Sequence, residues 1–249
     1  MNLKTLPLAF AILAVFAVHS AAGQVKESAG SNIKEGVGGT WKGPKINLIS
    51  GIIKPKQTPK QAGRRVYKGL PPRPAPSVET GDVKFMSNGD SGVAKTLADS
   101  FGRDPAEKAA LAEAFNQIKQ GYDTEAAKEG KSNDLAAAMM FFIAANLTAF
   151  HQSDLPTDEA GESLYQSLRT SMSTTPEFTK LSNTEKQQMH DWLVCMGGFV
   201  IAGHMEAKQS GDQDSLTNFT QIADQSMLIV LGVGAGKLQF GPTGLEPVQ

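Results

Sequence analysis

The chain has 249 residues, of which 40% are hydrophobic and 20% charged, and its formal net charge at pH 7 is −1. This length and apolar content suit one folded domain with an appendage. Cys195 is the only cysteine, which excludes a fold held by intrachain disulfides and a zinc site built on cysteine pairs. Stability must therefore come from a packed core.

Residues 1–22 have the three-part pattern of a secretory signal peptide. Lys4 supplies a basic start, Leu6–Val18 is an apolar run, and small residues follow it. The run is shorter than the roughly 20 residues that a membrane span needs, so we expect cleavage rather than a permanent anchor. A cut after Ala22 or Gly23 leaves a mature chain without a transmembrane segment. We therefore predict an exported protein, periplasmic or secreted.

The charges of the chain are divided unevenly. Residues 24–80 hold eleven Lys and Arg against three Glu, whereas residues 81–249 hold twelve against twenty-two Asp and Glu. Residues 23–90 are rich in Gly, Pro and Lys, and such a composition buries too little apolar surface to offset the entropy of ordering. We predict a flexible basic arm there. Within it, residues 46–53 can pair as a short strand, and Leu70–Pro76 should be extended polyproline.

The densest basic cluster of the arm comprises Arg64, Arg65 and Lys68. Excess positive charge on such a segment can engage an anionic envelope component or a protein partner. Nucleic acid is not expected as a partner, because the cluster lacks the repeated aromatic residues of a single-strand platform. A solvated spacer without a binding role is the alternative.

Helical signals begin after residue 90. Apolar residues at helical spacing predict a helix that ends before Gly102, and Asp104 with Pro105 marks the start of a second helix. The apolar stripe of the second helix comprises Leu111, Phe115, Ile118 and Tyr122. This stripe predicts an amphipathic helix with one buried face.

The segment Leu135–Phe150 is apolar on nearly every face. Ser132 or Asn133 can cap it as a helix. A helix that is apolar all round belongs at the centre of a bundle, and this one is short for a membrane span. We therefore place it in the core.

Three further helices are expected. Thr157 or Asp158 caps the first, and Ser182–Glu185 forms a capping box before a long second helix. The glycines Gly197 and Gly198 weaken this long helix unless a neighbouring helix approaches closely there. A final helix ends near Gly232, and no strand is expected after residue 90. The fold class is thus an all-α bundle of about five to six helices over residues 91–240, followed by a tail at 241–249.

Three stretches resemble an uncharacterised family of exported bacterial helical domains. They are Ser132–Ala138, the block Leu181–Trp192, and the ending Gly241–Leu245. The resemblance covers Val93–Leu245 and leaves the arm outside. It implies a bacterial source and a helical fold, and it carries over no activity and no functional residue.

His190 and Asp191 are the weak candidates for a metal site, which residues from other helices would have to complete. A histidine on a polar helix face is the alternative. His204 cannot join them, because a rise of about 1.5 Å per residue separates it from His190 by about 21 Å. His151 suits the C-terminal dipole of the apolar helix. No resident metal or cofactor is expected.

Cys195 falls among apolar residues of the long helix, which predicts a buried, inert thiol. The favoured interpretation is therefore an exported, non-enzymatic binding or interaction domain. The alternative is an envelope hydrolase or a metal-handling protein with a site around His190 and Asp191.

Overall fold

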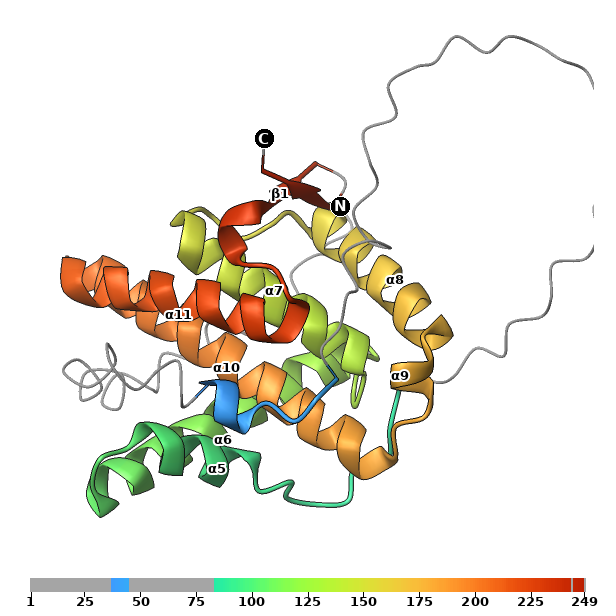
Figure 1. Ribbon diagram of the computed structural model, residues 1–249, viewed down its shortest axis with the longest axis horizontal. Coiled ribbons are helices and arrows are strands. Elements are labelled where there is room, and N and C mark those ends of the chain that lie inside the picture. The colour runs from blue at the N-terminus through green and yellow to red at the C-terminus, as the bar shows by residue number, and fades with distance from the viewer. Residues whose placement is uncertain (1–36, 45–82, 243, 249) are drawn as a thin grey trace, which may run out of the picture.

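The computed structural model describes residues 37–44, 83–242 and 244–248 (Figure 1). The predicted signal peptide, the polyproline segment and the cluster of Arg64, Arg65 and Lys68 lie outside the described residues. The elements are α5 (Val93–Phe101), α6 (Pro105–Lys128), α7 (Leu135–His151), α8 (Asp158–Thr174), α9 (Pro176–Thr179), α10 (Asn183–Ser210), α11 (Gln213–Leu231), a 3-10 turn at Ala235–Lys237, β1 (Leu238–Gly241) and β2 (Gly244–Pro247).

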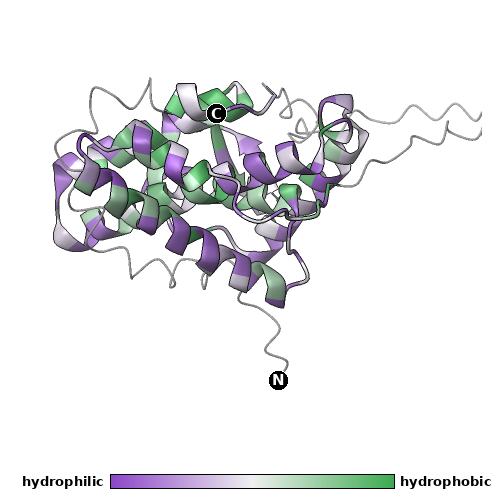
Figure 2. Cartoon of the chain, turned by 90° about the horizontal axis from the view of Figure 1, so that it is seen from below, coloured by the Kyte–Doolittle hydropathy of each residue, from purple (hydrophilic) through white to green (hydrophobic). Residues whose placement is uncertain are grey.

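Helix α7 forms the centre of the bundle. It contacts α8, α10 and α11, and every residue from Leu135 to Ala149 is buried. These three helices cover it with their apolar faces. Figure 2 shows hydrophilic and hydrophobic residues alternating along most helices, as expected where one side of a helix faces water. The prediction of a compact all-α bundle with this helix in the core is confirmed.

The cap of α7 is Asp134, so the prediction of Ser132 or Asn133 is wrong. One carboxylate oxygen of Asp134 accepts hydrogen bonds from the backbone N–H groups of Ala136 and Ala137, at 2.9 and 3.1 Å. Its other oxygen accepts a bond of 2.8 Å from the Tyr165 hydroxyl in α8. Asn133 instead takes a left-handed backbone conformation in the preceding turn, with φ of 51°.

Helix α10 packs closely on two neighbours at its glycine pair. A side-chain carbon added to Gly197 would lie 3.1 Å from the Cα atom of Phe142 in α7, and one added to Gly198 would overlap Ile118 of α6. The predicted close approach is confirmed. The capping box that starts this helix is also present, with Ser182 and Glu185 bonded reciprocally.

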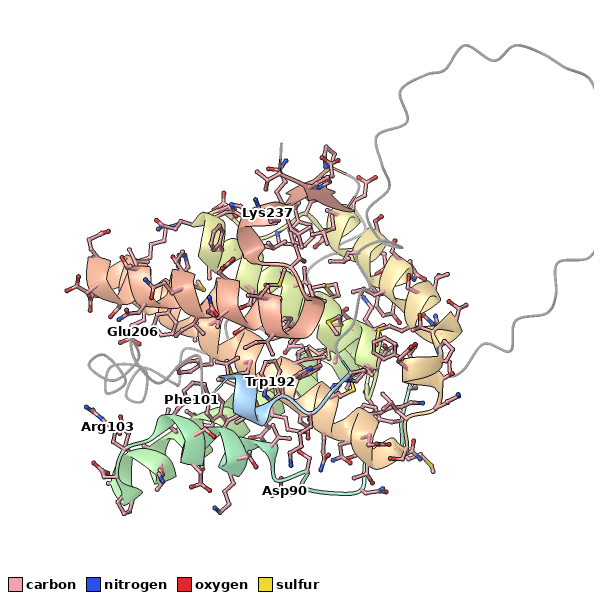
Figure 3. All side chains as sticks on the ribbon, in the orientation of Figure 1. Asp90, Phe101, Arg103, Trp192, Glu206 and Lys237 are labelled. Atoms are coloured by element: carbon pink, nitrogen blue, oxygen red, sulfur yellow. The ribbon has the colours of Figure 1, made fainter. Side chains whose placement is uncertain are left out.

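Residues 37–44, which the sequence assigned to the arm, pack on the helical domain. Val37 is fully buried, and the Thr40 hydroxyl accepts a hydrogen bond of 3.0 Å from the indole N–H of Trp192 in α10. In Figure 3, the labelled Trp192 lies against the ribbon of this segment. The core therefore includes residues far outside the predicted helices.

The stretch at 83–90 also lies on the domain. The carbonyl of Val83 accepts a hydrogen bond of 3.2 Å from the N–H of Leu135. The side-chain amide of Gln187 accepts a bond of 2.9 Å from the N–H of Asn88 and donates to the carbonyl of Gly89. This stretch leads the chain into α5 along the start of α10.

A short antiparallel hairpin ends the described chain, and the expectation of no strand after residue 90 is wrong. Strands β1 and β2 pair Leu238 with Pro247 and Phe240 with Leu245. Four-residue strands with Gly and Pro carry no alternating pattern from which to predict them. His151, expected to serve the dipole of α7, has its Nε2 atom 2.7 Å from the carbonyl of Leu238 and so ties the hairpin to the bundle.

Across the three described ranges, no helix combines the length and the apolar content required to cross a bilayer.

Candidate functional site

His190 and Asp191 lie in a buried polar network between α10, α6 and the turn before α5. Their exposed fractions are 1% and 2%. One carboxylate oxygen of Asp191 is 2.9 Å from Nδ1 of His190, and the other accepts a hydrogen bond of 2.6 Å from the Ser91 hydroxyl. The ammonium of Lys119 lies 3.7 Å from Asp191. The network thus joins three elements that are distant in the sequence.

Lys119 supplies the positive charge of this network. Burial by itself lowers the pKa of the Lys119 ammonium, but its hydrogen bond to Asp123 and the charge of Asp191 outweigh burial and raise that pKa. Lys119 therefore stays protonated at neutral pH. The pairing links α6 to α10.

The hydrogen bonds among Ser91, Asp191 and His190 run in a different order from those of a serine hydrolase triad. There the serine hydroxyl donates to the imidazole, whereas Ser91 donates to Asp191. Nε2 of His190 is buried without a hydrogen-bond partner among the described residues, and the ring meets Phe85 and Tyr122 edge-on at centroid distances of 5.1 and 5.6 Å. In the described ranges, no three or more His, Cys, Asp and Glu side chains gather where they could hold a metal ion.

Cys195 is fully buried in α10, as predicted. Its sulfur lies 3.6 Å from the carbonyl of Phe115, and burial raises the pKa of its thiol. A neutral thiol without solvent access is a poor nucleophile.

A cleft that the sequence did not predict lies between residues 37–44, α5 and α10. It encloses about 230 Å³. Trp41 and Trp192 contact each other there at a centroid distance of 4.8 Å and an interplanar angle of 63°. The sequence offers one indication that Trp41 packs on the domain: it is the single aromatic residue between residues 24 and 66.

The walls of this Trp41–Trp192 cleft add a few polar groups. Lys42, Thr96, Glu185 and Gln188 are among its lining residues. Hydrogen bonds from the side chain and backbone of Ser182 lower the pKa of Glu185, so its carboxylate is charged at neutral pH.

The indole N–H of Trp41 is an unpaired polar group in the cleft walls. It is buried and has no acceptor among the described residues. Buried N–H groups in proteins nearly always have a partner, which can be a water molecule or a bound ligand.

Comparison with protein families gives one match, to the family described as "Family of unknown function (DUF6683)", over residues 45–247. The chain belongs to the DUF6683 family. The predicted resemblance to a domain of unknown function is confirmed, and the match begins earlier than the expected start at Val93. No curated protein and no solved structure matches the chain.

The DUF6683 match includes the walls of the cleft that come from α5 and α10, and residues 37–44 precede it. It also includes a second, smaller pocket of about 60 Å³ between α6, α7 and α8. Arg64, Arg65 and Lys68 fall inside the match but outside the described residues, so their binding role stays a prediction.

Proposed function

We propose that this DUF6683 protein is an exported binding domain without catalytic chemistry of its own, and that the Trp41–Trp192 cleft is its ligand site. The observation that carries the proposal is the buried indole N–H of Trp41 without an acceptor at the wall of this cleft. Leaving such a group unpaired costs about 1–3 kcal/mol. A ligand that supplies an acceptor recovers that free energy on binding.

The lining favours a small ring-shaped ligand with an apolar face and hydrogen-bonding groups at its edge. The two indoles offer flat apolar surface, whereas Thr96 and Gln188 offer a hydroxyl and an amide. Glu185 and Lys42 carry opposite charges, so a neutral ligand suits the cleft. Its volume of about 230 Å³ is below the ~300–1,000 Å³ typical for drug-sized ligands, which favours a single ring.

Intrinsic fluorescence offers a direct test, because Trp41 and Trp192 are the only two tryptophans of the chain. Titration with single-ring polyhydroxylated compounds and cyclic amides should give a saturable change in emission and a rise in Tm. Trp41→Phe keeps an aromatic ring and removes the N–H donor, so it should weaken binding severalfold. Gln120→Ala on the exposed face of α6 is the control. If none of these compounds gives a saturable change in tryptophan emission, the proposal is wrong.

The proposal of export rests on separate features of the sequence, which are the apolar run Leu6–Val18 and the small residues after it. Sequencing the N-terminus of the protein isolated from its native host should begin near residue 23 or 24. An intact Met1 in the cytoplasmic fraction is the contrary result. In an exported protein, Arg64, Arg65 and Lys68 would contact an anionic envelope component or a protein partner.

A further inference from the structure

The second pocket, named here the α6–α8 pocket, has an aromatic floor and a charged rim. Tyr122 of α6 and Phe141 of α7 form part of the floor, with ring centroids 5.1 Å apart. Pro156 and Gly161 lie on the side of α8. Aromatic floors of this kind are the surfaces on which proline-rich segments pack.

The rim of the pocket carries excess negative charge. Four carboxylates line it, those of Glu125, Glu129, Asp158 and Glu162, together with the cation of Lys131, while Lys128 pairs with Glu125 at 2.6 Å. Lys131 lies 3.2 Å from Glu129 and 3.1 Å from Glu162, and these two pairs hold its ammonium at the rim. The four carboxylates still outnumber the lysines beside them, so the rim attracts a further cation.

Tyr122 also brings a phenol group to the pocket lining. Its side chain is only 7% exposed and lines the pocket. Burial, and after it the charge of Asp134, raises the pKa of this phenol well above its usual value. The hydroxyl therefore stays protonated at neutral pH and can donate a hydrogen bond.

The chain passes the rim of the pocket on its way into the domain. Lys84 pairs with Asp134 in an isolated antiparallel bridge, and its ammonium donates a bond of 3.0 Å to the carbonyl of Gly130. Gly130 lies between the rim residues Glu129 and Lys131. The residues that precede Val83 therefore start next to the pocket.

We propose that the α6–α8 pocket binds Leu70–Pro76 of the same chain, with the guanidinium of Arg73 among the rim carboxylates. This segment ends seven residues before Val83. At about 3.1 Å per residue, seven extended residues reach roughly 22 Å, ample for a return to the rim. The inference does not depend on the Trp41–Trp192 cleft.

Three features of the segment match the pocket. Its prolines suit the floor of Tyr122 and Phe141. A polyproline helix has no internal hydrogen bonds, so its carbonyls need outside donors, and the Tyr122 hydroxyl is such a donor. The planar guanidinium of Arg73 can donate two parallel hydrogen bonds to one carboxylate. The net charges of the two parts are also opposite, because residues 24–80 hold eleven Lys and Arg against three Glu, and residues 81–249 hold twelve against twenty-two Asp and Glu.

Paramagnetic NMR on the full chain tests the proposal. The only native thiol is that of the fully buried Cys195, so a cysteine introduced by Ala75→Cys takes a nitroxide label selectively. The label should weaken the amide signals of Glu129 and Gly161 severalfold relative to those of α11. Arg73→Gln should restore those signals, whereas Lys68→Gln, which removes the same charge nearby, should not.

Three outcomes would overturn the inference. Signals at the pocket can stay at full intensity. They can weaken evenly over all acidic faces of the domain, which indicates unspecific attraction of the basic arm. They can weaken only in mixtures of spin-labelled and isotope-labelled copies, which shows that the segment of a second copy occupies the pocket.

Discussion

The indole N–H of Trp192 donates a hydrogen bond of 3.0 Å to the hydroxyl of Thr40, which lies 152 residues earlier in the chain. Both side chains are buried. The bond fixes residues 37–44 to α10 and thereby closes one wall of the Trp41–Trp192 cleft. A local substitution in this N-terminal segment should therefore affect the stability of the whole domain.

Thr40→Val keeps the shape of the side chain and removes the acceptor. Because the indole N–H of Trp192 then stays buried and unpaired, we expect a loss of about 1–3 kcal/mol in the free energy of unfolding. Thr217→Val, on the exposed face of α11, should change it by less than about 0.5 kcal/mol. Urea unfolding measures both. Equal effects of the two substitutions would contradict the role of the Thr40 bond.

Phe142→Ala tests the central position of α7. The side chain of Phe142 is fully buried, so its deletion should lower the free energy of unfolding by about 3–5 kcal/mol. Leu228→Ala is the matched control, since Leu228 is 47% exposed and its loss should cost under about 0.5 kcal/mol. Denaturant titration followed by circular dichroism separates the two. A near-zero effect of Phe142→Ala would instead place α7 at an interaction surface.

The helical glycines give a prediction with opposite signs. Gly198→Ala should destabilise the domain by about 1–3 kcal/mol, because the added methyl group overlaps the side chain of Ile118. Gly161→Ala in α8 meets no atom within 4 Å, so it should stabilise the domain by up to about 1 kcal/mol through better helix propensity. Thermal unfolding of both variants checks the signs. Equal shifts in Tm would argue against the close packing of α10 on α6.

His204 makes stability depend on pH. Burial, and after it the charge of Lys208, lowers the pKa of His204 below the ordinary histidine value of about 6.5. The unfolded chain therefore binds a proton more readily than the folded one between the two pKa values. The contribution of His204 to stability is fully present above about pH 6.5 and declines as the pH falls toward the folded pKa.

His204→Leu removes this titration. The parent should lose more of its free energy of unfolding than the variant when the pH drops from 7.5 to 5, with the difference appearing below about pH 6.5. Chemical unfolding at a series of pH values measures the two slopes. Parallel curves would show that His204 titrates alike in both states.

Local patterns explain which parts of the fold can be predicted. The caps at Asp104 and Ser182 act within one helical turn, so neighbouring residues are enough to recognise them. The apolar surface of α7 is likewise visible in its own sequence. The hairpin carries no such pattern, because its two short strands gain their stability from the bundle beneath them.

Contacts across long separations explain what the sequence does not reveal. His190 and Asp191 are neighbours in α10, but their partners Ser91 and Lys119 come from other elements. The pairing of Trp41 with Trp192 has no local signature either. Polar networks and clefts of this kind depend on how the helices pack, which helical periodicity alone does not determine.

The docking of residues 37–44 also has a kinetic consequence. These residues leave the ribosome before the helices do, yet Thr40 and its partner Trp192 are 152 residues apart, and α10 is complete only once Ser210 has been made. Closing so long a loop is entropically costly, so this contact should form after the folding transition state. Loss of the Thr40 hydroxyl should therefore accelerate unfolding and leave the folding rate unchanged. The contact of residues 37–44 with α10 therefore sets the unfolding rate of the finished domain rather than its folding rate.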